Sequence, residues 1–97
     1  MKGKTTLVDI VLEILNGRKP EEVKKKYYLT VKAVVAKRVR LYLSAEDINE
    51  IEEIAQDITQ DFFLWLLRED VKKGFTKRKE RLTSEYLLKK INGLIID

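Results

Sequence analysis

The sequence predicts an all-α protein that forms a single domain over residues 1–97. Three observations indicate this class: the chain contains only one Pro and four Gly, it is rich in Leu, Ile, Lys and Glu, and its apolar residues recur at steps of three and four. A chain of this length is large enough to bury one hydrophobic core. The scarcity of Pro and Gly argues against a β-sandwich or barrel.

The first predicted helix follows an N-cap at Thr5 or Thr6 and ends at Gly17. Its polar side chains keep to one side, which is the pattern of a helix with one buried face. The apolar face consists of Leu7, Ile10, Val11, Ile14 and Leu15.

Two further helices are predicted before residue 44. Pro20 suits a first helical position and is followed by two acidic residues, so a second helix begins there and runs to Tyr27. Thr30 is a natural N-cap for a third helix, which continues to residue 43. Only residues 28 and 29 separate the two helices, so the joint between them is short.

Residues 44–74 are predicted to form one long helix, because no Pro or Gly interrupts them before Gly74. Ser44 followed by Asp47 resembles a capping box, and two lysines precede Gly74. The run 62–67 is apolar on every side, so it must be covered by the rest of the chain and by a second copy. We therefore expect a homodimer whose interface contains Ile58, Phe62, Phe63, Trp65 and Leu66.

The end of the chain predicts a basic loop over residues 75–81 and then a short last helix. Ser84 is the expected cap of that helix, and Gly93 lies just past its expected end. Residues 94–96 form an apolar tail that packs on a partner or frays.

The composition excludes several classes of function. The chain has no Cys and no His, which removes disulfides, the common zinc sites and histidine-based catalysis. The carboxylates of the long helix lack converging ligands from other elements, so we expect no catalytic residues, no metal, no cofactor and no enzyme activity. The apolar runs are too short to span a bilayer and residues 1–6 lack the apolar region of a signal peptide, so we expect a cytoplasmic protein without membrane contact. Abundant Lys and Glu without Cys also fit a thermophile.

The charges are segregated along the chain. Residues 1–43 carry 11 Lys or Arg against 4 Asp or Glu, residues 44–70 carry 1 against 9, and residues 71–97 carry 8 against 3. The ends are therefore basic and the middle is acidic. Concentrated positive charge is what phosphate binding requires, because each contact releases counterions.

Residues 20–39, PEEVKKKYYLTVKAVVAKRV, resemble the helix-turn-helix superfamily of DNA-binding proteins, and with the first helix the resemblance covers residues 5–43. It assigns Thr30 to the cap after the turn, and it implies that the third helix enters the major groove of double-stranded DNA. The core positions would be Val23, Tyr27, Leu29 and Val34. The chain departs from the usual pattern at Lys24, Tyr28 and Arg38.

On this reading the protein is a small dimeric transcriptional regulator, with residues 44–97 mediating self-association. The start of the third helix would reach base edges through Thr30, Lys32 and Ala36. The phosphate contacts would come from Lys24, Lys25, Lys37, Arg38 and Arg40, with a second set in the basic loop formed by Lys77, Arg78 and Lys79.

Two other interpretations remain open. Residues 30–91 are similar to the histone fold, with a short helix, a long helix and a short last helix, which implies DNA packaging with little sequence preference. Its core would include Val31, Val34 and Val35, the apolar residues of the long helix, and Leu82 in a short strand. We favour the helix-turn-helix because it also explains the first two helices. The third interpretation is a helical protein-interaction module that binds no nucleic acid.

Overall fold

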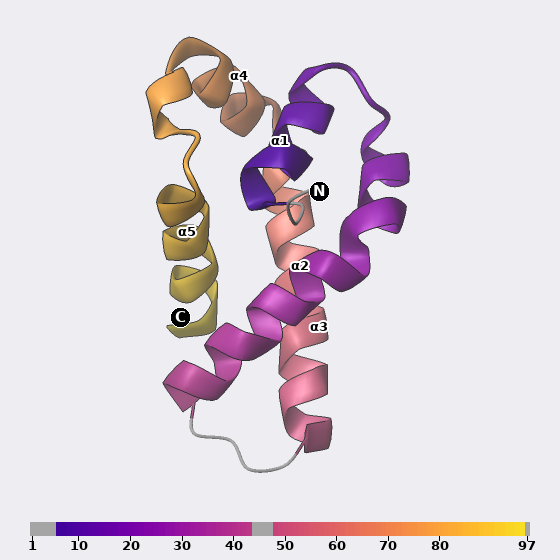
Figure 1. Cartoon of the computed structure of the whole chain (residues 1–97), viewed down its shortest axis with the longest axis vertical. Coiled ribbons are helices and arrows are strands. Elements are labelled where there is room, and N and C mark those ends of the chain that lie inside the picture. Colours follow the sequence, from indigo (N-terminus) through magenta and orange to yellow (C-terminus); the bar gives the residue numbers. More distant parts are fainter. Residues whose placement is uncertain (1–5, 44–47, 97) are drawn as a thin grey trace, which may run out of the picture.

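A computed structural model describes residues 6–43 and 48–96 and confirms the all-α class (Figure 1). No described residue lies in a strand, so Leu82 is not in the short strand that the histone-like layout predicts. The helical elements in chain order are α1 (Leu7–Leu15), α2 (Pro20–Leu43), α3 (Ile48–Leu66), α4 (Glu69–Lys77), the 3-10 turn η1 (Lys79–Arg81) and α5 (Ser84–Ile96).

Helix α1 begins with the capping box that threonine at this position allows. The Thr6 hydroxyl accepts a hydrogen bond from the Asp9 amide at 3.2 Å, and the Asp9 carboxylate accepts one from the Thr6 amide at 3.0 Å. Just past its end, Gly17 has φ +93°, a left-handed conformation that glycine adopts without strain. The predicted limits of the first helix are thus confirmed.

Helix α2 is one continuous helix from residue 20 to residue 43, so the predicted joint at residues 28 and 29 is wrong. The joint contains Tyr28 and Leu29 and no Gly, so nothing in it favours the positive φ that would end a helix. Packing also favours one continuous helix, because the same side of α2 is buried before and after residues 28 and 29. The buried residues are Val23, Val31, Val35 and Val39.

The long helix predicted over residues 44–74 is broken in the structure. Helix α3 ends at Leu66, and α4 starts at Glu69 after Arg68, whose backbone is extended at φ −68°, ψ 135°. The turn redirects α4 so that Phe75 is buried with its ring 6.0 Å from that of Trp65. The start of α4 carries two acidic residues, an N-terminal signal that the preceding apolar run concealed. The predicted cap at residues 44 and 47 lies outside the described residues.

The last helix starts and ends differently from the prediction. The hydroxyl of Thr83, and not that of Ser84, accepts the hydrogen bond from the Tyr86 amide at 3.1 Å. Helix α5 continues through Gly93 to Ile96. The apolar tail is therefore helical, with Ile95 buried against the core and Ile96 exposed.

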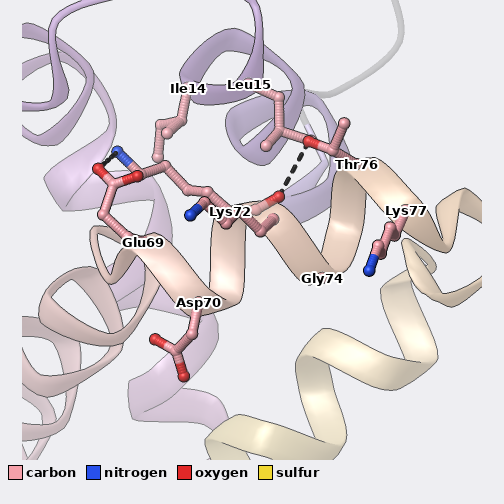
Figure 2. Close-up of a pocket in the computed structure, with 9 residues that line it drawn as sticks. Ile14, Leu15, Glu69, Asp70, Lys72, Gly74, Thr76 and Lys77 are labelled. Atoms are coloured by element: carbon pink, nitrogen blue, oxygen red, sulfur yellow. Dashed lines mark hydrogen bonds and ion pairs between the residues drawn. The ribbon is translucent and has the colours of Figure 1, made fainter.

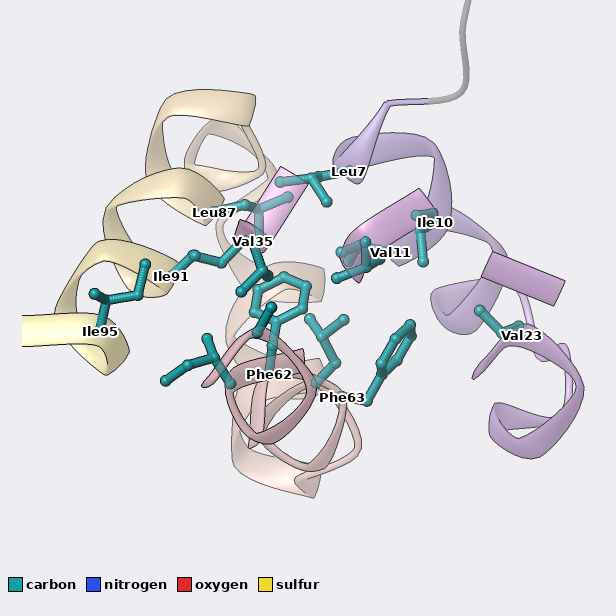
Figure 3. Packing of buried hydrophobic residues seen from close by; sticks show 14 of the residues in the cluster. Leu7, Ile10, Val11, Val23, Val35, Phe62, Phe63, Leu87, Ile91 and Ile95 are labelled. Carbon is teal, nitrogen blue, oxygen red and sulfur yellow. The ribbon is translucent and has the colours of Figure 1, made fainter. Parts of the chain in front are cut away.

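The core lies where α3 is covered by α2, α5 and α1 (Figure 3). Phe62 points toward Val35 of α2, while Phe63 lies on the side of α1. Four of the five residues predicted for a dimer interface are buried inside the single chain, and Trp65 is half-buried: the four are Ile58, Phe62, Phe63 and Leu66. The chain's own helices therefore cover most of this apolar run, and the predicted interface residues stay a prediction. The homodimer itself stays a prediction.

Candidate nucleic-acid interface

The outward side of α2 carries an exposed line of residues spaced four, four, four and three apart. This spacing places them on one face of the helix, opposite the buried valines. Helix α2 crosses α3 and packs on it with its buried side (Figure 1), so this face is exposed to solvent, and at its edge Leu29 and Ala33 line a hollow with Glu52 of α3. We name this exposed side of α2 the basic face, formed by Lys25, Leu29, Ala33, Lys37 and Arg40.

The cations of the basic face have no ion-pair partner among the described residues. Within residues 6–43 and 48–96, Lys25, Lys37 and Arg40 form no ion pair or hydrogen bond through their side chains. They extend over about 22 Å of helix, at 1.5 Å per residue. Helix α2 as a whole carries seven Lys or Arg and two Glu. The exposed side of α2 therefore carries a positive electrostatic potential along its length.

The outward side of α3 has the opposite charge. Helix α3 contains five acidic residues and no Lys or Arg. Its buried side faces α2, and its exposed side presents Glu50, Glu53, Asp57 and Asp61. The two helices therefore turn opposite charges toward opposite sides. This distribution of charge would favour the approach of a polyanion to α2 over its approach to α3.

The predicted base-contacting residues lie beside the basic face. Thr30, Lys32 and Ala36 are all half-buried. The Lys32 ammonium lies 2.5 Å from Oε2 of Glu52, and this hydrogen bond to the carboxylate raises the lysine's pKa above its usual 10.5. Lys32 is therefore charged at neutral pH and already engaged with α3.

The predicted phosphate contacts fall into two separate groups. Lys25, Lys37 and Arg40 share the basic face, while Lys24 and Arg38 are half-buried and lie, by helical spacing, on the side of α2 that carries Val31 and Val35. The second group is exposed at the end of α4 and in η1, away from the outward side of α2 (Figure 1): Lys77, Arg78 and Lys79. The structure therefore does not bring all eight onto one surface.

Sequence reasoning missed two members of the basic face. The helix-turn-helix resemblance predicts that Leu29 lies in the core, but Leu29 is 74% exposed, and Ala33, one turn along the helix, is also exposed. A single helical period applied across residues 20–43 places both beside Lys25 and Lys37. The expected joint concealed this relation.

Metal ligation and membrane insertion have no support in the described residues. In residues 6–43 and 48–96, no three His, Cys, Asp or Glu side chains converge as metal ligands. No helix in the same ranges has the length and apolar character needed to cross a bilayer. Comparison with protein-family models, curated proteins and solved structures found no match to this chain in any of the three.

Proposed function

We propose that this protein binds double-stranded DNA through the basic face of α2. The observation that supports this is a row of three cations along one exposed side of α2: Lys25, Lys37 and Arg40. They have no ion-pair partner in residues 6–43 and 48–96, and the charged residues of the neighbouring helix α3 are all acidic. A row of fixed cations releases counterions from phosphates, which is the main source of sequence-independent affinity for DNA.

The chemistry of the face favours sequence-tolerant binding. Its middle holds Leu29 and Ala33, which can touch a thymine methyl but donate no hydrogen bond to a base. Lys32 would have to leave Glu52 before it reached a base edge. We therefore propose that contacts to phosphates supply the affinity for DNA. This favours a packaging or architectural role over sequence-specific binding by a transcriptional regulator.

The experiment compares two triple variants that remove the same charge. The first, Lys25→Ala/Lys37→Ala/Arg40→Ala, strips the basic face, and the control, Lys73→Ala/Lys77→Ala/Lys79→Ala, strips exposed lysines near α4. Anisotropy of a fluorescent duplex is measured over a salt series. We expect the slope of log affinity against log salt to fall by about 3 for the first variant, since each phosphate contact contributes about 0.9.

The control variant should keep most of the affinity and of the salt slope. Equal losses in both variants would mean that net charge alone attracts DNA, and an unretarded duplex at low salt for the wild type would remove DNA binding altogether. Duplexes of unrelated sequence should bind within a few-fold of one another. A preference of about a hundredfold or more would overturn the sequence-tolerant mode.

A further inference from the structure

A groove separates α1 from α4, and the proposed DNA contact does not use it. The two helices make few direct contacts, and two adjoining hollows of about 740 and 410 Å³ lie between them. The hollows meet at Leu15 and Thr76, which line both. Figure 2 shows Ile14 and Leu15 reaching from α1 toward α4.

The α1 side of this groove is apolar. Val8, Leu12 and Leu15 are spaced four and three apart, so they form one stripe along α1, and Leu82 lies across the smaller hollow. Leu12 is 41% exposed and the other three are half-buried. The chain's own helices leave this stripe partly exposed, whereas they bury the neighbouring apolar face of α1, which consists of Leu7, Ile10, Val11 and Ile14.

The charged side chains around the groove that are not already in ion pairs are positive. Glu69 is paired with Lys72 at 3.2 Å, as Figure 2 shows, and Asp70 is paired with Arg68 at 2.9 Å. Three exposed lining lysines have no such partner in the described part of the chain: Lys73, Lys77 and Lys79. An occupant must therefore supply apolar side chains on one side and carboxylates at its edges.

We propose that the α1–α4 groove docks an acidic amphipathic helix of a partner protein. Apolar residues one turn apart on such a helix would enter the two hollows, and flanking Asp or Glu would meet the three lysines. Helix α4 spans nine residues, about 13 Å, so the contact covers two to three turns of the partner. A DNA duplex offers phosphates to the lysines but no apolar side chain for the stripe, so the groove favours a peptide.

The test uses a fluorescent peptide of about 15 residues with Leu at i, i+4 and i+8 and Glu or Asp elsewhere. A second peptide of identical composition carries the same leucines scattered around the helix. We expect the first to bind with micromolar affinity and to shift the amide resonances of residues 8, 12, 15, 76 and 82 in the full-length protein. The scattered peptide should bind at least about tenfold more weakly.

Two groove variants and two controls locate the contact. Leu12→Asp and Lys77→Glu/Lys79→Glu should each weaken the peptide by about tenfold or more. Leu64→Asp, which adds the same charge at a 61% exposed leucine of α3, and Lys25→Ala/Lys37→Ala/Arg40→Ala should not. If Leu12→Asp lowers the midpoint of thermal unfolding, only Lys77→Glu/Lys79→Glu is used to locate the contact, because both of these lysines are exposed and their replacement should not disturb the fold.

Three outcomes would overturn the proposal. Equal affinity for both peptides would show charge attraction without docking. Loss of binding in the α2 variant and not in the groove variants would place the peptide on the basic face. Displacement of the peptide by duplex DNA from a protein that lacks the α2 cations would assign the groove to nucleic acid. None of these depends on whether the basic face binds DNA.

Discussion

Lys32 of α2 and Glu52 of α3 form an ion pair whose Nζ and Oε2 atoms lie 2.5 Å apart. This ion pair links α2 and α3, whose exposed sides carry opposite charges and face in opposite directions. In the described part of the chain it is the ion pair that joins α2 to α3. Lys32 is therefore better placed to orient α2 on α3 than to probe DNA.

Replacing Lys32 with Met should lower stability at neutral pH, and this loss should become smaller at strongly alkaline pH. The hydrogen bond to Glu52 raises the lysine's pKa in the folded protein. Because the pKa of Lys32 is higher in the folded protein than in the unfolded chain, the ion pair stabilises the fold fully at pH values below the unfolded pKa of about 10.4. This stabilisation is lost as pH rises through the pKa of Lys32 in the folded protein. Urea unfolding at about pH 7 and about pH 11 measures the change. Lys37→Met is the control, because the Lys37 side chain is exposed and has no ion-pair partner among the described residues, and it should change stability little. A destabilisation of equal size at both pH values would assign the role of Lys32 to packing of its stem.

Glycine at position 29 tests the continuity of α2. Leu29 is 74% exposed, so its side chain contributes little packing. Inside an uninterrupted helix, Leu29→Gly should cost about 1 kcal/mol relative to Leu29→Ala, because glycine loses more backbone freedom. Chemical denaturation of the two variants gives the difference. In a helix-turn-helix the same residue would lie in a turn, where glycine is tolerated, and an equal or higher stability of the glycine variant would restore that joint.

Truncation at position 62 tests whether the aromatic run belongs to the core of one chain. Phe62 is fully buried and Leu64 is 61% exposed, two residues along the same helix. Phe62→Ala should lower the free energy of unfolding by about 3 to 5 kcal/mol, whereas Leu64→Ala should change it by less than about 0.5. Sedimentation accompanies the unfolding data. If Phe62→Ala converted a dimer into a stable monomer without loss of stability, the burial assigned to Phe62 would be refuted.

The sequence predicts the helical class and the local signals well, and it predicts the long-range pairing poorly. The capping box of Thr6 and Asp9 and the turn at Gly17 depend on neighbouring residues, so they are visible in the sequence. The break after Leu66 has one local signal, the acidic start of α4, but the contact of Phe75 with Trp65 that accompanies the break is not encoded in any local pattern. The sequence of the apolar run 62–67 is also the same whether α1, α2 and α5 of one chain bury it or a second copy of the protein does. For the same reason the lysines of α2 are visible in the sequence, but the pairing of Lys32 with Glu52 is not.

Two glycines provide a last comparison, because the same substitution should act in opposite directions. Gly17 has a left-handed φ of +93° with nothing within 4 Å of an added Cβ, so Gly17→Ala brings backbone strain without a clash and should cost about 1 kcal/mol. Gly93 lies inside α5 with equally open space, so Gly93→Ala should stabilise the protein by about 0.5 to 1 kcal/mol through the better helix propensity of alanine. Thermal and urea unfolding of both variants measure the signs. A destabilising Gly93→Ala would mean that α5 ends before residue 93, as the sequence alone predicts, and a neutral Gly17→Ala would mean that the turn after α1 is not left-handed.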